Sequence, residues 1–475
     1  MNPSAEPHGL KRELRLGDLV LLQVVLIVGF GWLGSTAKEG STHVVLWLAG
    51  IVFFYLPLGA VVILLSRAIP VEGGAYQWVK AGISPFAGYL AAWNTSFYTI
   101  IVLGTQGPSL INSVAYIAGP RGAWMMNSGL LIVGASTVCL LAMFVVNVRG
   151  LHLGKWVTGS GSILTLVLSV LMLFLLVRRW ISGVPAAHPP FSLAMPALSI
   201  LTLNVFTKMS IGALAGFDNS GVFAGECRKP DRDLPLSVWL SAPMIAGTYI
   251  LGTAAILAYV PLGSIDLAAP VAQLMEAGFG NSGLGEILTI GSITAMNLIW
   301  FAGSLGLLAV ASRFPMVIGW DGLLPTWWSD LHPTFRTPVK ALAIVTGACL
   351  LITFTSSWGA GGQEIFQIGI GAGAACLCIM YALLFFVALA GKRSVGLRPG
   401  LGVRLAALSG FVVSVAALPL QVVPIAGVPH PLIFGLKVGG LVCGVNAVGA
   451  WLYWRGRTRL EERMRGSKTH AAPSR

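Results

Sequence analysis

Two stretches in which glycines interrupt an apolar run decide the fold. The first is Val28-Gly29-Phe30-Gly31-Trp32-Leu33-Gly34, which has three glycines in seven residues. The second is Ile211-Gly212-Ala213-Leu214-Ala215-Gly216-Phe217-Asp218-Asn219-Ser220-Gly221, which ends in small and polar residues. Each glycine costs about 1 kcal/mol of helix propensity relative to alanine. Both stretches therefore predict helices that break in the middle.

The surrounding chain is too apolar for a soluble protein. Of its 475 residues, 56% are hydrophobic and 10% are charged, whereas soluble domains carry about 25% charged residues. A helix that crosses a bilayer needs about 20 apolar residues, so we expect an all-α polytopic membrane protein with about 12 transmembrane helices. The expected spans are 17–36, 43–67, 84–117, 124–147, 154–177, 199–226, 235–261, 284–312, 338–357, 364–390, 404–422 and 431–454.

The positive charges lie very unequally on the two sides of these spans. Of the 30 Lys and Arg residues, 24 fall on the side of the N terminus. The others are Lys38, Arg121, Arg178 and Arg179 on the opposite side, and Lys208 and Lys437 inside spans. Positive residues collect on the cytoplasmic side of membrane proteins. We therefore predict a multi-pass protein of the cytoplasmic membrane with both termini in the cytoplasm, and the net charge of +13 needs no nucleic-acid partner.

Residues that would support enzymatic, metal or ATP chemistry are scarce or scattered. The seven histidines have no metal-ligand spacing, and the six cysteines lie mostly inside apolar runs, where cysteine is a small buried hydrophobe. The sequence has no Gly-x-x-x-x-Gly-Lys-Ser/Thr loop. No span carries the polar stripe along its length that a channel needs. We therefore expect neither an enzyme nor a channel, and no cofactor.

The two breaks fall in spans 1 and 6, which are corresponding members of two five-helix halves. Interrupted helices at matching positions indicate the binding site of an inverted-repeat transporter. The outer half of span 1 begins at mid-depth with free N–H groups, which suit a carboxylate. The outer half of span 6 ends there with free C=O groups, which suit an ammonium group. The alternative is that the glycines only allow close helix packing.

Four groups of short motifs occur in and between the spans. They are Pro70-Val71-Glu72-Gly73-Gly74-Ala75-Tyr76-Gln77-Trp78-Val79; Asn147-Val148-Arg149-Gly150; Ala215-Gly216-Phe217-Asp218 with Glu226-Cys227-Arg228-Lys229-Pro230 and Leu234-Pro235; and Arg313 with Asp321-Gly322-Leu323-Leu324-Pro325, His332-Pro333 and Arg336-Thr337-Pro338. In this order, over about residues 17–390, they resemble the amino acid permeases of the amino acid–polyamine–organocation (APC) family. The resemblance implies a five-plus-five inverted repeat of the leucine-transporter type and secondary active transport of amino acids across the membrane.

The implied division of the chain has five parts. They are a cytoplasmic segment at 1–16, a first repeat at 17–178, a second repeat at 179–390, helices 11 and 12 at 391–456, and a basic cytoplasmic tail at 457–475. Alternative functions are a carrier of polyamines or other organic amines, and an amino acid exchanger. The scarcity of acids near the breaks disfavours polycations. The coupling ion, H+ or Na+, and the oligomeric state stay open.

The resemblance places the substrate at the two breaks. It implies that Gly29–Gly31 meets the carboxylate and that the carbonyls around Ala213–Ala215 meet the amine. The expected lining is Val28, Gly29, Phe30, Gly31, Ala213, Leu214, Ala215 and Gly216. Two residues depart from the family. Phe30 replaces a small residue and either narrows the site or faces a neighbouring helix. Gly212 replaces a common aromatic gate, so that a wider mouth or a gate from elsewhere is expected. Thr165 aligns near a lysine of some sodium-independent members.

Several polar residues near mid-depth have two interpretations each. Asp218 either caps the inner half of span 6 or has a proton- or substrate-linked role. Lys208 either snorkels outward or binds an anionic group in the outer vestibule. Asn94 and Tyr98 share a helix face and contact either another helix or the substrate side chain. Ser304 presents the same choice.

The remaining candidates flank the spans or the second break. Asn219 follows the second break and is within reach of a substrate there. Glu226, Arg67 and Arg313 lie at inner helix ends. We expect them to form ion pairs of an inner gate, with simple snorkelling as the alternative for the arginines.

Overall fold

The computed structural model describes residues 12–118, 122, 124–125, 128–265, 269–280, 282–357, 362–391, 396–423 and 430–470. Within these ranges the regular structure is helical, and one isolated bridge joins Leu14 to Cys227. The α-helices are α1 (Leu16–Ile27), α2 (Gly31–Ala37), α3 (His43–Gly50), α4 (Leu56–Ala68), α5 (Ala75–Gly82), α6 (Pro85–Gly104), α7 (Gly107–Ala118), α8 (Gly129–Val148), α9 (Leu151–Ile181), α10 (Ile200–Gly212), α11 (Pro230–Tyr259), α12 (Pro270–Phe279), α13 (Leu284–Trp320), α14 (Val339–Ser357), α15 (Gly362–Ala390), α16 (Leu401–Leu420) and α17 (Pro431–His470). A π-helical turn, η2 (Ile51–Tyr55), joins α3 to α4, and 3-10 segments lie at η1 (Gly40–Thr42), η4 (Phe217–Glu226), η5 (Leu262–Ser264) and η6 (Thr326–Ser329).

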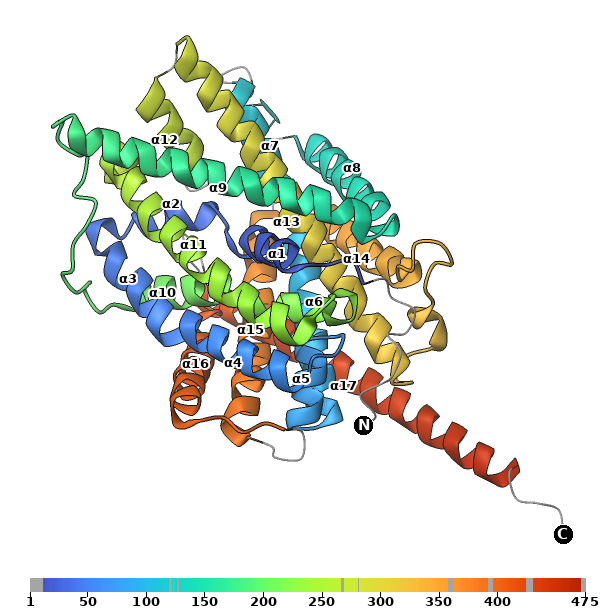
Figure 1. Ribbon diagram of the computed structural model, residues 1–475. Helices are drawn as coiled ribbons and strands as arrows, with labels where there is room; N and C mark the ends of the chain where they lie inside the picture. The colour runs from blue at the N-terminus through green and yellow to red at the C-terminus, as the bar shows by residue number, and fades with distance from the viewer. Residues whose placement is uncertain are drawn as a thin grey trace.

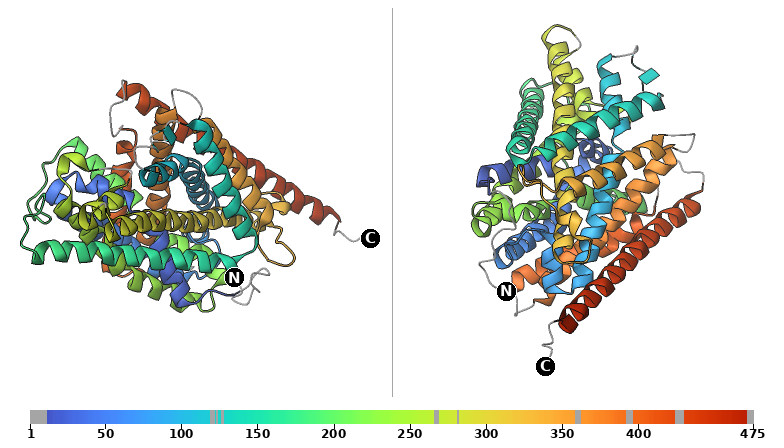
Figure 2. Two further views of the ribbon diagram at one scale, coloured as in Figure 1. Left: turned by 90° about the horizontal axis from the view of Figure 1, so that it is seen from above. Right: turned by 90° about the vertical axis from the view of Figure 1, so that its right-hand side faces the viewer.

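The helices form one bundle with α1 near its centre (Figure 1). α1 packs against α9, α11 and α13, which come from distant parts of the chain. α17 runs along one edge, and its C-terminal end projects beyond the other helices (Figure 2). The first interrupted helix is therefore surrounded by protein, which is the condition under which irregular backbone is tolerated at membrane depth.

The composition correctly predicted an all-helical membrane fold. Nine helices in the described ranges are long and apolar enough to cross a membrane, and α1 with α2 makes a tenth span if the bent pair counts as one. The predicted spans 199–226 and 338–357 correspond to α10 with η4 and to α14, whose apolar part is shorter. The count of twelve, the inverted repeat and the division into five parts stay predictions.

The prediction of a single helix over 84–117 is wrong. α6 ends at Gly104 and α7 begins at Gly107, because Thr105 has φ −103° and ψ 6° and leaves the helical conformation. Pro108 in the first turn of α7 suits the start of a new helix. A Cβ on Gly104 would lie 2.6 Å from Ile352, so close packing on α14 fixes the end of α6.

The chain ends differ in how they are organised. α17 continues from the last predicted span to His470, so the basic tail predicted at 457–475 is helical as far as it is described. Arg457 pairs with Glu461 at 2.9 Å, one turn apart on the exposed helix. The predicted cytoplasmic segment 1–16 is described from residue 12 onward, and Arg121 lies outside the described residues.

The Gly-Gly pair in the first motif is required by a close approach of two backbones. Gly73 and Gly74 have φ of 105° and 46°, a region that residues with side chains rarely adopt. A Cβ on Gly74 would also lie 2.9 Å from the backbone N of Val222 in η4. The turn between α4 and α5, which includes Glu72, is thereby held against η4.

Candidate substrate site between two broken helices

The first break separates α1 from α2. α1 ends at Ile27, Val28 is extended with φ −72° and ψ 105°, and α2 begins at Gly31 at an angle of 49° to α1. The amide of Trp32 donates to the carbonyl of Gly29 and starts the first turn of α2. The N–H groups of Phe30 and Gly31 have no acceptor among the described residues. They are therefore available to a ligand.

The second break separates α10 from η4. The amides of Ala213 and Leu214 both donate to the carbonyl of Met209, at 2.8 and 3.2 Å, which tightens the end of α10. Gly216 has φ 125°, and the chain continues as a 3-10 helix. The carbonyls of Leu214 and Ala215 accept no hydrogen bond from the part of the chain that is described. The second break therefore offers acceptors where the first offers donors.

Tyr249 on α11 joins the two breaks. Its hydroxyl accepts a hydrogen bond from the N–H of Gly29 at 3.0 Å and lies 2.7 Å from the carbonyl of Ile27 and 3.1 Å from that of Ala213. Its ring stacks on Trp47 with centroids 4.5 Å apart. The resemblance assigned the Gly29 N–H and the Ala213 carbonyl to the substrate, but here Tyr249 uses both. No motif or spacing in the sequence marked Tyr249 as a site residue.

Asp218 lies in the first turn of η4, whose N-cap is Gly216. Its Oδ1 accepts a hydrogen bond from the hydroxyl of Tyr381 on α15 at 2.9 Å, and the residue is only 2% exposed. Tyr98, which the sequence paired with Asn94, lies on α6 and packs against the same buried core as Tyr249 and Tyr381. Tyr381 on α15 therefore fixes the carboxylate of Asp218 at the start of η4.

Asn94 contacts another helix. Its Nδ2 donates to Oδ1 of Asn446 on α17 at 2.8 Å, and the Nδ2 of Asn446 returns a bond to Oδ1 of Asn94 at 3.2 Å. Asn94 is fully buried. Of the two interpretations that the sequence allowed, this geometry favours the helix–helix contact.

The remaining polar candidates near the breaks are placed as follows. Thr165 is buried and donates to the carbonyl of Gly161 within α9 at 2.9 Å. The α9 hydroxyl that reaches α1 is that of Ser162, which donates to the carbonyl of Leu21. Ser304 is buried on α13, and neither its hydroxyl nor the side-chain amide of Asn219 has a hydrogen-bond partner among the described residues.

Lys208 lies in α10, on the side of the break away from the N terminus. Its Nζ donates to the carbonyl of Val423, just after α16, at 3.1 Å. Asn204, one turn earlier on α10, is buried with its Oδ1 unpaired in the described part of the structure. Lys208 therefore links α10 to the chain just after α16.

A cluster of polar side chains joins α1, which precedes the first break, to η4, which follows the second break. Gln23 on α1 donates through Nε2 to Ser220 in η4 at 3.1 Å and to Ser237 on α11 at 3.0 Å. Ser241 on α11 donates to its Oε1. All these side chains are buried, and the amide is satisfied at both ends. α1, η4 and α11 are thus linked on the side facing the N terminus.

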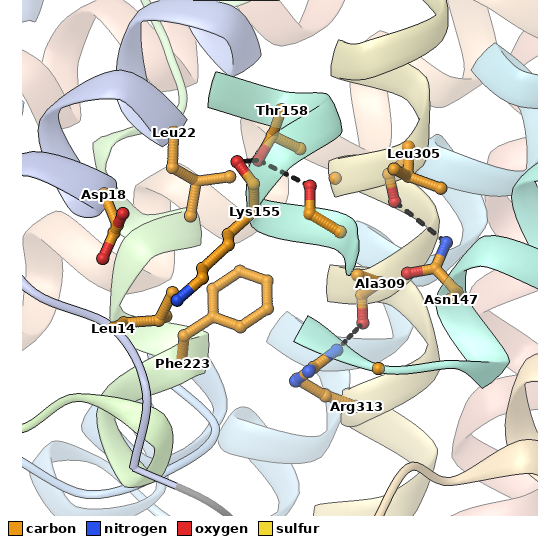
Figure 3. Close-up of a pocket in the computed structure, with 13 residues that line it drawn as sticks. Leu14, Asp18, Leu22, Asn147, Lys155, Thr158, Phe223, Leu305, Ala309 and Arg313 are labelled. Carbon is orange, nitrogen blue, oxygen red and sulfur yellow. Dashed lines mark hydrogen bonds between the residues drawn. The ribbon is translucent and has the colours of Figure 1, made fainter. Parts of the chain in front are cut away.

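A pocket opens on this side between α1, η4, α9 and α13 (Figure 3). Its volume is about 40 Å³, which holds roughly three water molecules. The side chain of Lys155 on α9 points into it toward Leu14 and Phe223. Leu22, on the last turns of α1 before the break, lines it as well. α1 and η4, the helices next to the two breaks, therefore also form walls of this pocket.

Three buried charged residues lie together beside the pocket. Arg313 donates through Nη2 to both carboxylate oxygens of Glu226, at 2.7 and 2.9 Å, and its Nε lies 3.7 Å from Oε1 of Glu72. Glu72 accepts the N–H of Gly225 at 2.6 Å. Burial, together with the Glu226 carboxylate, raises the pKa of Glu72 well above its ordinary value. Arg67, in contrast, is exposed and forms no ion pair with any described residue.

The segment before α1 is fastened to the same cluster. The amides of Glu13 and Leu14 both donate to the carbonyl of Glu226 at 3.0 Å. The amide of Arg228 donates to the carbonyl of Leu14 at 3.1 Å. The start of α1 and the end of η4 are therefore held together at the mouth of the pocket.

Two interrupted helices that meet inside an apolar bundle, with a pocket on one side of them, define a membrane transporter of the broken-helix class. The described residues contain no group of three or more His, Cys, Asp or Glu that could hold a metal ion. The chain belongs to the amino acid permease family, which matches residues 15–434. It is a membrane transporter and not an enzyme.

Individual relatives and one solved structure are similar over most of the chain. An uncharacterized transporter of Legionella pneumophila is 25% identical over 70% of this chain and 71% of its own length. The vacuolar cationic amino acid transporter 4 of Arabidopsis thaliana is 27% identical over 73% of this chain and 59% of its own. The crystal structure of MhsT in complex with L-phenylalanine has a TM-score of 0.60 and 16% identity, covering 86% of this chain and 98% of that one. The last similarity shows a shared fold.

Proposed function

We propose that this chain is a secondary transporter that moves amino acids across the cytoplasmic membrane by alternating access. The observation that carries the proposal is the pair of breaks, with free N–H groups at Phe30 and Gly31 and free C=O groups at Leu214 and Ala215. A zwitterion satisfies both sets at once, because its carboxylate suits the donors and its ammonium group suits the acceptors.

The excess of positive charge on the N-terminal side supports an orientation with both termini in the cytoplasm. The pocket beside Lys155 is then the inner vestibule through which substrate leaves. The cluster of Arg313, Glu226 and Glu72 lies beside this vestibule and serves as the inner gate. Opening this gate requires the bonds between Leu14, Glu226 and Arg228 to move with it.

A neutral amino acid is the substrate class that the site supports best. Asp218, in the first turn of η4, already accepts a hydrogen bond from the hydroxyl of Tyr381, and Lys208 donates to a backbone carbonyl. A second candidate is a cationic amino acid or an organic amine, which the name of the Arabidopsis relative favours. Such a substrate needs an acid near its side chain, and Asp218, in the first turn of η4, is the candidate.

Uptake by the purified full chain in proteoliposomes tests the proposal. A panel of labelled neutral, cationic and acidic amino acids is offered with an imposed sodium gradient, a proton gradient, both or neither. We expect concentrative uptake of at least one neutral amino acid, and the gradient that drives it identifies the coupling ion. Uptake of labelled substrate only into vesicles preloaded with unlabelled amino acid would identify an exchanger. Absence of any amino acid or amine transport would refute the proposal.

A further inference from the structure

The indole of Trp32 spans the gap between the two broken helices. Trp32 lies in the first turn of α2 and its side chain is partly buried. A Cβ built on Gly29, in the first break, would lie 3.0 Å from its Cδ1. A Cβ built on Gly212, the last residue of α10, would lie 2.3 Å from its Cζ2 and 2.7 Å from its Cη2. One ring therefore packs against a glycine at each break.

The contact with Gly212 leaves no room for a second side chain. Real Cβ atoms do not approach other heavy atoms to 2.3 Å, so any residue other than glycine at 212 would displace the indole. Trp32 and a side chain at 212 therefore compete for the same volume. This volume lies between the first turn of α2 and the last residue of α10.

The indole of Trp32 is held by packing alone. Its N–H has no acceptor among the described residues, whereas the indole N–H groups of other tryptophans in the bundle donate to fixed partners. These are Trp47 to Thr253, Trp78 to the carbonyl of Ile69, Trp93 to the carbonyl of Val445 and Trp300 to Gln106. A ring without a hydrogen bond leaves its position without orphaning a buried donor, as a gate requires.

We propose that Trp32 is the aromatic gate of this transporter and limits the size of the substrate side chain. The Trp32 ring, which comes from α2, fills the volume that a large side chain at position 212 of α10 would fill. This explains why position 212 is a glycine. Ile27, Val28, Phe30 and Leu214 at the breaks are apolar and belong to the buried core, which suits an uncharged substrate side chain beneath Trp32. This inference rests on the proposed function and specifies its substrate class.

Moving the aromatic side chain from position 32 to position 212 tests this role. Trp32→Ala removes the ring, Trp32→Phe shortens it, and Trp32→Ala with Gly212→Phe returns an aromatic ring to the same volume from the other helix. Trp180→Ala is the matched control, because Trp180 is 83% exposed at the end of α9. KM and Vmax are measured for neutral amino acids graded from alanine to tryptophan, on variants that elute as a single species and show cooperative melting.

In Trp32→Ala we expect the ratio of uptake efficiency for large over small substrates to rise about tenfold or more, the scale of discrimination that pocket size supplies. Trp32→Phe should lie between this variant and wild type, and the double variant should return toward the wild-type ratio. Trp180→Ala should match wild type. Unchanged ratios in Trp32→Ala, or a double variant no closer to wild type than Trp32→Ala, would overturn the inference while leaving the proposed function intact. No transport by wild type would overturn both.

Discussion

The hydroxyl of Tyr249 lies 3.0 Å from the backbone N of Gly29 and so binds α11 directly to the first break. The same oxygen lies 3.1 Å from the carbonyl of Ala213 at the second break. One side chain therefore sets the separation of the two interrupted helices. The substrate-binding groups that remain free, at Phe30 and Gly31 and at Leu214 and Ala215, take their positions from it.

Replacement of Tyr249 by phenylalanine should impair transport more than stability. The Gly29 N–H then loses its acceptor in a buried site, which costs about 1–3 kcal/mol. We expect a lower melting temperature in detergent and a fall in uptake efficiency of about tenfold or more, since 1.4 kcal/mol corresponds to tenfold. Uptake by proteoliposomes and thermal unfolding monitor the two effects.

The control is Tyr259→Phe on the same helix. The hydroxyl of Tyr259 donates to the carbonyl of Leu175 at 3.0 Å, far along α11 from the breaks. This variant should lose comparable stability and keep its transport. If both variants transport equally well, Tyr249 does not position the site.

A bulky residue at Gly31 should block the site without disturbing the fold. A Cβ on Gly31 meets no atom within 4 Å, so the protein itself has room for a side chain. Gly31→Val would place its methyl groups beside the free N–H groups of the first break. We expect substrate binding to disappear while the melting temperature changes little. Gly17→Val, in α1 with equally open surroundings, is the control. Full binding by the Gly31 variant would refute the role assigned to this break.

The Asn94–Asn446 pair should behave as a structural contact. Asn94→Leu or Asn446→Leu alone leaves a buried amide without its partner, at a cost of about 1–3 kcal/mol. The double variant removes both amides and should recover much of that loss, giving a coupling energy of about 0.6 kcal/mol or more. Thermal unfolding of the four proteins measures the cycle. A change in substrate preference in Asn94→Leu would point instead to contact with the substrate.

The stability of the inner cluster should fall as the pH rises. The pKa of Glu72 is raised in the folded protein, so the folded state holds a proton that the unfolded state has lost between the ordinary pKa and the raised one. This stabilisation is complete at pH values below the ordinary pKa and disappears as the pH rises through the raised value. Unfolding measured from pH 5 to pH 9 should show the decline.

Glu72→Gln mimics the protonated form and should flatten this pH dependence. Arg313→Met should lower the stability instead, because it leaves the Glu226 carboxylate buried without its cation, at a cost of about 3–5 kcal/mol. Other groups near the cluster are Glu13, Cys227 and Asp233, which the variants retain. An unchanged pH slope in Glu72→Gln would show that Glu72 is not the group that holds the proton.

Local signals made much of this architecture predictable. Long apolar runs indicate the spans, and glycines within them indicate the breaks. Both signals can be read from a short stretch of sequence, because hydrophobicity and helix propensity are local properties. The division of the predicted span 84–117 was not predictable in this way. It depends on the packing of Gly104 against α14, about which the local sequence carries no information.

The contacts that hold the site and the surrounding helices together join residues far apart in the sequence. Tyr249 stands 220 residues from Gly29, and Asn94 stands 352 residues from Asn446. A tyrosine inside an apolar run looks like any buried aromatic residue until its partners are known. Trp32 was visible in the first break, and Gly212 was recognisable as lacking an aromatic gate, but only the fold brings the two together.

The most direct test of the central claim is a competition measurement with three ligands that share one side chain. They are the transported amino acid, its decarboxylated amine and its deaminated carboxylic acid, each added in excess to proteoliposomes during uptake of the labelled amino acid. A site built from free N–H groups at one break and free C=O groups at the other needs both charged ends, so only the intact amino acid should compete strongly. Competition by the amine as strong as that by the amino acid would contradict the account and would favour an organic amine carrier.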